Sequence, residues 1–433
     1  MEKIVELCKR RGFIFPGSEI YGGMANTWDF GPLGVELKNN IKQAWWRKFV
    51  QQRSDVVGLE SALIMNPKVW QASGHVDHFH DELIECKECH GRFRSDEAEK
   101  ENECPLCGAK GSWTEPAKFN TMFKTFVGPK EEEADTAYLR PETAQGMFVD
   151  WPLVAQTSRQ RLPFGVAQIG KAFRNEITPG NFIFRTREFE QMEIEYYIKA
   201  EEWEEHFGMW FKQMHEWLED CGVDMDRVHD HEIPDGERAH YSKRTVDIEF
   251  EWPFGRKELY GLAYRGDYDL KLHADASGRD FTYTDPNTGE KFLPHVIEPS
   301  FGLERTLLAV LLSAYKEEDV GGEQRTVLRL PSSLAPYQVA VLPLSRKDEL
   351  TKIAEPLAQD LRKSLRCDYD VTQSIGKRYR RQDEIGTPYC VTVDFDSIED
   401  GQATVRERDS MKQERMAISD ISGYLEDKFC NNC

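Results

Sequence analysis

The sequence contains no apolar run long enough to cross a membrane. Its longest apolar run is TLLAVLLSA at residues 306–314, whereas a transmembrane helix needs about 20 predominantly apolar residues. The first twelve residues, MEKIVELCKRRG, alternate charged and apolar side chains and lack the apolar core of a signal peptide. These two absences argue against a membrane protein and against a secreted one. We therefore expect a cytoplasmic protein with no membrane partner.

Positive charge is scarce relative to negative charge. The 433 residues include 56 Lys and Arg against 76 Asp and Glu, which gives a formal net charge of -20. A protein that coats nucleic acid needs a dense basic surface to release the counterions of the phosphates, so that class is excluded and any nucleic-acid contact must be local. In a cytoplasmic chain of this length, ten cysteines indicate thiols and metal ligands rather than a disulfide framework.

Neither of the backbone loops that usually bind nucleotide phosphates is present. The chain has no GxxxxGK[ST] sequence, and no GxGxxG follows a predicted strand. Those loops hold phosphates through backbone N–H groups. A nucleotide bound to this chain would therefore be held by side chains, above all by arginines, whose guanidinium groups match phosphate oxygens.

Length and pattern indicate two domains of mixed type. A chain of 433 residues exceeds the size of one hydrophobic core. Aromatic and β-branched alternation over 135–195 and again over 245–264 predicts antiparallel strands, so the large domain is of the α+β class. Beyond about residue 332, strand and helix patterns alternate as in a small α/β domain.

Two helices of the large domain are marked by apolar stripes. One follows GPLG at 31–34, where apolar residues recur every four positions at Leu37, Ile41, Trp45 and Phe49. The other covers 201–221, where a stripe of tryptophan, phenylalanine and methionine lies opposite a run of glutamates. We expect both helices to pack on the core.

An arginine-rich hairpin, FRNEITPGNFIFRTREF at 173–189, is the first candidate for a phosphate site. In a strand, alternate side chains share a face. If Phe182 to Tyr197 is one strand, a single face carries Arg185, Arg187, Phe189, Gln191 and Glu193. That face suits a nucleoside triphosphate beside an amine, although arginines and glutamates on exposed strands also pair with each other for little stability. The hairpin alone leaves both interpretations open.

A second arginine follows a predicted strand in EPSFGLER at 298–305. Gly302 permits close approach of the backbone, and Arg305 falls in the first turn of a helix with an apolar stripe. The start of a helix also favours anions. This segment is therefore a second candidate for binding phosphate.

A cysteine-rich insert predicts a structural zinc site. CKEC and CPLC each place two thiols in a C-x2-C knuckle, and together they supply four ligands, Cys86, Cys89, Cys104 and Cys107. Four thiolates complete a closed tetrahedral site with no catalytic water. Unmetallated thiols are the alternative. The nearby histidines are predicted to be solvated or structural, because four thiolates already saturate zinc.

Several of these segments resemble the sequence motifs of one enzyme family. FRNE with TREF, and then EPSFGLER, resemble motifs 2 and 3 of the class II aminoacyl-tRNA synthetases, and GPLG with its helix resembles motif 1. More narrowly, RPETAQG at 140–146, REFEQME at 187–193, ELYGLAYRGDYDL at 258–270 and EPSFG at 298–302 resemble the dimeric glycyl-tRNA synthetases. The resemblance extends over essentially the whole chain.

This resemblance implies an architecture and an activity. It implies a class II catalytic domain over 1–331, an antiparallel sheet flanked by helices, with a helical insert at 200–243. The zinc-ribbon-like insert of four cysteines at 81–118 within this domain rests on the cysteine spacing more than on the resemblance. An anticodon-binding α/β domain would occupy 332–433. The implied activity is glycine–tRNA ligation, with ATP, glycine and tRNA(Gly) as partners, Mg²⁺ and structural Zn²⁺ as metals, and a homodimer as the assembly.

The resemblance also implies which residues bind ATP. Arg174 would hold the α-phosphate and the carboxylate, and Glu176 would bind the adenine amino group. Arg185 and Arg305 would meet the terminal phosphates, with Phe189 stacked under adenine and Arg305 above it. Arg174 and Arg305 are the implied catalytic residues, and the remaining members of the ATP site are Asn175, Phe184, Glu258, Leu259 and Gly302.

A glycine pocket and a metal site are implied in the same way. Glu142 and Glu193 would hold the ammonium group with help from Ser300, and Arg94 and Glu298 would lie near the substrate. Glu258 and Glu298 would be magnesium ligands, since a hard cation that bridges phosphates prefers oxygen. A surface ion pair is the alternative for Glu258. Larger amino acids are rejected by steric clash, so no editing domain is required.

The C-terminal domain contains a basic stretch, GKRYRRQDEIGTPYCVTVD at 376–394. Basic groups beside an aromatic ring suit phosphates and splayed bases. Arg378, Arg380 and Arg381 are candidate anticodon contacts, and a solvated helix face is the equal alternative for each of them.

Two other functions compete with glycine–tRNA ligation. A class II synthetase for threonine, proline, serine or histidine would share the ATP motifs, but RPETAQG and EPSFG favour glycine. A noncatalytic synthetase-like subunit that binds nucleic acid would lose the motif arginines, whereas Arg174, Arg185 and Arg305 are all present.

Overall fold

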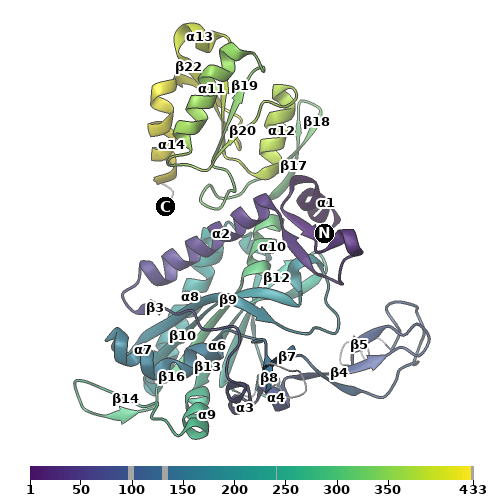
Figure 1. The fold of residues 1–433 in the computed structure, drawn as a ribbon, viewed down its shortest axis with the longest axis vertical. Coiled ribbons are helices and arrows are strands. Elements are labelled where there is room, and N and C mark those ends of the chain that lie inside the picture. The colour runs from purple at the N-terminus through teal and green to yellow at the C-terminus, as the bar shows by residue number, and fades with distance from the viewer. Residues whose placement is uncertain (96–101, 129–134, 240, 431–433) are drawn as a thin grey trace.

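The structure is a computed structural model that describes residues 1–95, 102–128, 135–239 and 241–430. Its centre is a seven-stranded sheet in the order β11-β12-β13-β16-β10-β9-β3 (Figure 1). In that order the strands are Val228–Glu232, Arg244–Trp252, Gly255–Gly266, His295–Gly302, Glu188–Ile198, Phe164–Phe173 and Val56–Gly58. Every pair is antiparallel except β3 with β9 at the edge. The expected α+β class with an antiparallel sheet is confirmed.

The two faces of this sheet differ in polarity because side chains alternate along each strand. On β10, Met192, Ile194 and Tyr196 enter the main hydrophobic core. Helices α8 (Trp203–Asp220) and α10 (Leu303–Ala314) pack on this apolar face, and α2 (Pro32–Trp46) packs against α10. The opposite face carries Gln191 and Glu193, so one face of the sheet builds the core and the other is free for chemistry.

The first predicted helix forms as its stripe indicates. Leu37, Ile41, Trp45 and Phe49 are all fully buried, and the Trp45 ring lies 5.8 Å from that of Phe301 on the sheet. The last of the four stripe residues belongs to a π-helical turn, Arg47–Gln51, that continues α2. Gly34 is required where α2 begins, since a Cβ there would come within 1.8 Å of the Phe13 carbonyl oxygen.

The second predicted helix is also confirmed. α8 buries Phe207, Trp210, Met214, Trp217 and Leu218 against the sheet, while Glu204 and Glu205 lie in its first turn. The segment after it is not only helical, because β11 joins the edge of the main sheet.

The cysteine-rich segment leaves the main body beside the sheet (Figure 1). It follows helices α3 (Pro67–Ala72) and α4 (His75–His78), and its strands pair in the order β5-β4-β6. These strands are β4 (His80–Glu85), β5 (Arg92–Arg94) and β6 (Ala117–Asn120), and a hairpin of β7 (Lys124–Val127) and β8 (Asp135–Tyr138) follows.

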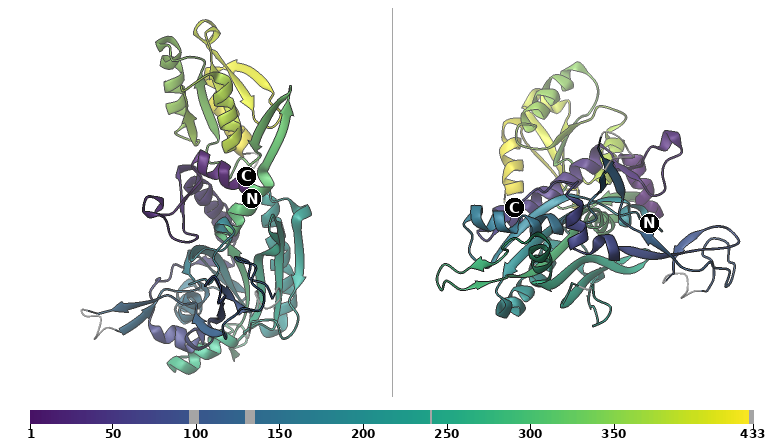
Figure 2. Two further views of the ribbon diagram at one scale, coloured as in Figure 1. Left: turned by 90° about the vertical axis from the view of Figure 1, so that its right-hand side faces the viewer. Right: turned by 60° about the horizontal axis from the view of Figure 1, so that its bottom comes forward.

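A second sheet with its own core forms the C-terminal part of the chain and stands at one end of the molecule (Figure 2). Its order is β20-β19-β21-β22-β23, with β19 parallel to β20 and β21. In chain order, its strands and helices are β19 (Val339–Pro343), α11 (Asp348–Leu361), β20 (Cys367–Tyr369), α12 (Ile375–Ile385), β21 (Tyr389–Val393), α13 (Asp396–Asp400), β22 (Gln402–Glu407), β23 (Gln413–Ala417) and α14 (Ile421–Cys430).

The remaining elements surround the two sheets or connect them. Hairpin β17–β18 follows α10 of the large domain and contacts the C-terminal domain, where buried Arg325 on β18 pairs with Asp383 of α12 at 2.9 Å. The hairpin strands and the other helices and strands are α1 (Glu2–Arg11), β1 (Ile14–Pro16), β2 (Trp28–Phe30), α6 (Ala144–Val149), α7 (Trp151–Ser158), α9 (Tyr268–Ser277), β14 (Tyr283–Thr284), β15 (Lys291–Phe292), β17 (Tyr315–Val320) and β18 (Glu323–Leu328). In the part of the chain that the structure describes, no helix is both long and apolar enough to span a bilayer.

Candidate active site

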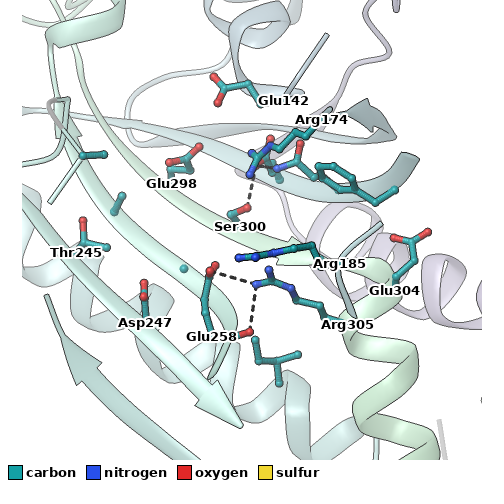
Figure 3. Close-up of a pocket in the computed structure, with 18 of the residues that line it drawn as sticks. Glu142, Arg174, Arg185, Thr245, Asp247, Glu258, Glu298, Ser300, Glu304 and Arg305 are labelled. Atoms are coloured by element: carbon teal, nitrogen blue, oxygen red, sulfur yellow. Dashed lines mark hydrogen bonds and ion pairs between the residues drawn. The ribbon is translucent and has the colours of Figure 1, made fainter. Parts of the chain in front are cut away.

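A cavity of about 380 Å³ lies on the polar face of the main sheet (Figure 3). Strands β10, β13 and β16 form its floor, and the loop after β9 and the start of α10 contribute to its walls. All the predicted ATP and glycine residues except Asn175 and Arg94 line it: Glu142, Arg174, Glu176, Phe184, Arg185, Phe189, Glu193, Glu258, Leu259, Glu298, Ser300, Gly302 and Arg305.

The two arginines expected to be catalytic meet in this cavity. Arg174 follows β9, and its Nε donates to the Pro141 carbonyl at 3.1 Å while its guanidinium group lies 5.3 Å from the Phe189 ring centre. Arg305 lies in the first turn of α10, where its Nη1 is 3.1 Å from Glu258 Oε2. A site in which side chains rather than a glycine-rich loop supply the cations is therefore present.

The loop between β9 and β10 differs from the predicted strand. β10 begins at Glu188 rather than Phe182, because Asn181 and Phe182 have positive φ angles of 57° and 61° and the chain forms a 3₁₀ turn here. The alternation assumed from Phe182 onward is therefore wrong. Arg187 does not line this cavity: its guanidinium group donates to the carbonyl oxygens of Ala25 and Glu176.

Arg185 reaches the cavity from the same loop. Its Nε lies 3.8 Å from Glu176 Oε2, and the backbone of this residue forms a bridge with Gly180. The turn that broke the strand thus brings Arg185 and Glu176 together at the wall of the cavity.

Carboxylates gather at the other end of the cavity. Glu193 is buried, and its Oε1 accepts from Ser300 Oγ at 2.8 Å and from Gln191 Nε2 at 2.7 Å. Thr143 Oγ1 donates to its other oxygen. Burial raises the pKa of Glu193, and the nearby charge of Glu142 raises it further. This end of the cavity therefore favours a cationic ligand, which would relieve the repulsion.

A buried arginine supports the carboxylates from below. Arg265 is 1% exposed, donates to both oxygens of Asp269 at 2.8 and 2.9 Å, and donates to both oxygens of Glu298 at 3.0 and 2.9 Å. Burial raises the pKa of Glu298 to about 8, although Arg265 opposes this shift. Burial acts on Glu142 in the same direction, but His75 and Arg265 outweigh it and hold the pKa of Glu142 well below its usual range.

Sequence reasoning missed this support. Arg265 and Asp269 lie four residues apart in ELYGLAYRGDYDL, and Gln145, which donates to both Glu142 and Asp269 at 3.0 Å, lies in RPETAQG. The feature of the sequence that could have indicated these residues is that they are polar side chains within the motifs that contain the predicted substrate-binding glutamates or follow them closely. Of the two roles expected for His75, solvated or structural, the structural one fits, because its Nε2 lies 3.4 Å from Glu142 Oε2.

Two further carboxylates were not predicted. Glu195 is fully buried, its carboxylate oxygens have no hydrogen-bond partner among the described residues, and one of them lies within 4.8 Å of carboxylate oxygens of Glu193 and Glu298. Asp247 lines the cavity from β12, and burial together with the charge of Glu258 raises its pKa to about 7. Period-two alternation along each strand would have identified both residues.

Two predicted residues lie elsewhere. The backbone N–H of Asn175 donates to the Thr121 carbonyl at 2.7 Å, and Asn175 is not among the residues that line the cavity. Arg94 ends strand β5 of the cysteine-rich segment, where its Nη1 lies 3.7 Å from Asp81 Oδ2. In this arrangement neither residue lines the cavity.

The four predicted zinc ligands converge. Their sulfur atoms all lie within 4.8 Å of one another, with 3.7 Å between Cys86 and Cys107 and 3.6 Å between Cys89 and Cys104. Four sulfurs about 2.3 Å from a tetrahedral zinc ion would be roughly 3.8 Å apart. The donor set and its spacing therefore fit Zn²⁺.

The candidate anticodon arginines are mostly engaged within the protein. Arg378 is 1% exposed and donates to the carbonyls of Pro343, Asp370 and Leu344, so it is a structural residue and neither a phosphate contact nor part of a solvated face. Arg381 pairs with Asp370, and Arg380 pairs with exposed Glu323.

Comparison with known proteins is consistent with this geometry. Residues 123–314 match the tRNA synthetase class II core domain (G, H, P, S and T), and residues 338–428 match the anticodon binding domain. The first match covers the loop and strands that build the cavity, and the second covers the C-terminal sheet.

Relatives that align with nearly the whole chain include several glycine–tRNA ligases. The chain is 52% identical over 455 residues to the glycine–tRNA ligase of Caldanaerobacter subterraneus subsp. tengcongensis, covering 99% of this chain and 98% of the relative. It is 54% identical over 456 residues to that of Lysinibacillus sphaericus, with 98% of each covered. For Thermobifida fusca the identity is 51% over 451 residues, with 99% and 98% covered. At this identity and coverage, with both domain matches in order, the chain belongs to the glycine–tRNA ligase family.

Proposed function

We propose that this chain activates glycine with ATP to form glycyl-adenylate and then transfers the glycyl group to the 3′ end of tRNA(Gly). One observation carries the proposal: Arg174, Arg185 and Arg305 share a single cavity with the carboxylate cluster of Glu142, Glu193 and Glu298. The arginines suit the phosphates of ATP and the carboxylates suit the ammonium group of an amino acid, and the reaction requires both substrates in one cavity. The enzymes with which the chain aligns over its whole length carry the name of this reaction.

In the first step, a glycine carboxylate oxygen attacks the α-phosphorus of ATP, and pyrophosphate leaves. Arg174 would hold the carboxylate and the α-phosphate in line, and Arg185 and Arg305 would bind the departing phosphates. Phe189 would stack on adenine. Positioning and fixed positive charge are enough to accelerate this reaction, since charge develops on phosphate oxygens.

In the second step, a terminal ribose hydroxyl of tRNA attacks the glycyl carbonyl, and AMP leaves. Glu142 and Glu193, with Ser300, would hold the ammonium group in both steps. The hydrogen bonds from Ser300, Gln191 and Thr143 fix the Glu193 carboxylate in place. A side chain on the substrate would meet this closely packed floor, so exclusion by contact favours glycine.

Metals would enter in two places. Mg²⁺ would neutralise phosphate charge, and Glu258 with the neighbouring Asp247 offers oxygen ligands at the cavity wall. Glu298 fits this role less well, since both its oxygens accept from Arg265. Zn²⁺ would close the four-cysteine site and stabilise the segment around it.

The domain arrangement, the location and the assembly concern the whole chain. We propose a catalytic domain over 1–331 and an anticodon-binding domain over 332–433, working in the cytoplasm as a homodimer. Three large side chains between β1 and β2 support a dimer, because Ile20, Tyr21 and Met24 are 88%, 87% and 62% exposed. Exposed apolar side chains grouped in this way mark interaction surfaces. Sedimentation equilibrium tests the assembly.

Amino-acid-dependent ATP–pyrophosphate exchange with all twenty amino acids tests the proposed function. We expect exchange with glycine and with no other amino acid. Alanine and serine should give only the background rate. Exchange that depends on threonine, proline, serine or histidine would show that the substrate is that amino acid and not glycine. No exchange with any amino acid, in folded protein supplied with Mg²⁺ and ATP, would support the noncatalytic alternative.

A further inference from the structure

A buried lysine of α2 lies behind the cavity. Lys38 is 9% exposed, and its Nζ lies 2.7 Å from Glu304 Oε1 and 2.7 Å from Glu190 Oε2. The other carboxylate oxygen of Glu304 accepts from the backbone N–H of Glu190 at 2.8 Å. This Lys38 triad, made of Lys38, Glu190 and Glu304, joins α2, β10 and α10 at one point.

Each glutamate of the triad is the chain neighbour of a predicted ATP residue. Glu190 follows Phe189 on β10, and Glu304 precedes Arg305 in the first turn of α10. Phe189, Glu304 and Arg305 line the cavity, whereas Lys38 is outside the set of described residues that line it. The triad therefore links the first turn of α10 to β10, and its lysine does so from outside the cavity.

Stability alone does not explain the triad. Burial by itself would lower the pKa of Lys38, but the carboxylates of Glu304 and Glu190 outweigh it and raise the pKa, so the ammonium group stays charged. Buried ion pairs usually give less stability than apolar side chains of similar volume, because each charge loses its hydration. What such a triad does provide is a fixed geometry among three elements.

We propose that Lys38 is a positioning residue for ATP, which sets the separation between Phe189 and Arg305 through Glu190 and Glu304. The inference rests on the proposed function, with adenine stacked on Phe189 and, as the family resemblance implies, covered on its other face by Arg305. A small displacement of α10 would widen or tilt that slot and weaken nucleotide binding, while the carboxylate end of the cavity, held by Arg265, would keep its shape.

Lys38→Met tests the proposal, with Lys42→Met as its matched control. Lys42 lies one turn further along α2, and within the described chain its Nζ pairs with Glu190 Oε1, at 3.4 Å, and not with Glu304. In glycine-dependent exchange, Lys38→Met should raise the KM for ATP about tenfold, since misplacement by a fraction of an ångström has effects of this order. Its KM for glycine should stay unchanged, and Lys42→Met should change neither constant.

A second variant covers the case in which Lys38→Met does not fold. Glu304→Gln keeps the size of the side chain and an oxygen for the Glu190 N–H, and it should show the same rise confined to ATP. Equal increases for ATP and glycine in a folded variant would indicate a structural role, and an unchanged KM for ATP would overturn the proposal. Isothermal titration calorimetry with ATP gives the Kd of each variant independently of catalysis. If wild-type protein binds ATP but performs no exchange, the proposed function fails while the same variants still decide the role of Lys38.

Discussion

Replacing Arg265 by methionine probes the buried network beneath the carboxylates. The substitution keeps an apolar stem of similar length and removes the cation that pairs with Asp269 and Glu298. Breaking a buried pair from one side costs about 3–5 kcal/mol, because the charge left behind, here that of the Asp269 carboxylate, is uncompensated. At about 2 °C per kcal/mol for a domain of this size, the midpoint of thermal unfolding should fall by roughly 6–10 °C.

The surface pair of Arg244 with Glu232 supplies a matched control. It is also bidentate, with both N···O distances at 2.9 Å, but its side chains are 37% and 48% exposed. Arg244→Met should therefore cost no more than about 1 kcal/mol. Differential scanning calorimetry of both variants measures the difference. Equal shifts for the two variants would refute the reasoning that burial makes the Arg265 network expensive to break.

The pH dependence of Arg265→Met has a definite sign. Burial gives Glu298 a folded-state pKa of about 8, well above its ordinary value. A raised carboxyl pKa stabilises the folded state fully at pH values below the ordinary pKa, and that contribution is lost as pH rises through the folded pKa. Without Arg265 the folded pKa is higher still. The stability of the variant should therefore continue to fall above pH 8, where that of the wild type levels off, and parallel curves would contradict this.

The zinc site, the C-terminal domain and the glycine pocket each offer a further prediction. Cys89→Ser should reduce bound zinc, measured by plasma emission spectroscopy, from one equivalent to less than half, and should make the segment around Cys104 sensitive to trypsin while the rest of the chain stays resistant. Zinc retained in full would argue against a four-cysteine site. Arg378→Ala removes three hydrogen bonds from a buried guanidinium group to backbone carbonyls and should lower the stability of the C-terminal domain by about 3 kcal/mol. Arg380→Ala should cost less than about 1 kcal/mol, and chemical denaturation measures both values. Glu193→Gln should raise the KM for glycine about a hundredfold and leave the KM for ATP unchanged, since it neutralises one charge facing the ammonium group; equal effects on both constants would place Glu193 outside the glycine pocket.

Periodicity predicted the elements whose burial follows a simple repeat. The stripe of Leu37, Ile41 and Trp45 predicted α2, and the position of Arg305 at the start of α10 followed from the strand and glycine before it. Hydrophobic burial dominates at such positions, so local pattern and tertiary structure agree.

Local pattern failed where backbone conformation or distant pairing decides. The strand assumed from Phe182 breaks because two consecutive residues, Asn181 and Phe182, adopt positive φ. Asparagine favours such angles, but a bulky residue such as phenylalanine rarely adopts them, so nothing in the sequence indicates the second one. Arg378 was a candidate nucleic-acid contact, but two of its partners are the carbonyls of Pro343 and Leu344, 35 and 34 positions away. A sequence shows no such pairing. The network of Arg265 was missed for the same reason: a buried arginine and a surface arginine look alike until the fold is known.

The central claim is that arginine side chains converging on one cavity bind ATP where no glycine-rich loop exists. Glycine-dependent ATP–pyrophosphate exchange of Arg174→Ala and Arg305→Ala, measured beside Arg187→Ala from the same loop as Arg174, tests it most directly. The first two variants should lose exchange by at least about a thousandfold while keeping the wild-type unfolding midpoint, because each removes a fixed positive charge from the reacting phosphates. Arg187→Ala should retain most activity, since Arg187 does not line the cavity and its guanidinium group is engaged by the backbone carbonyls of Ala25 and Glu176. Full exchange in folded Arg174→Ala or Arg305→Ala would contradict the account.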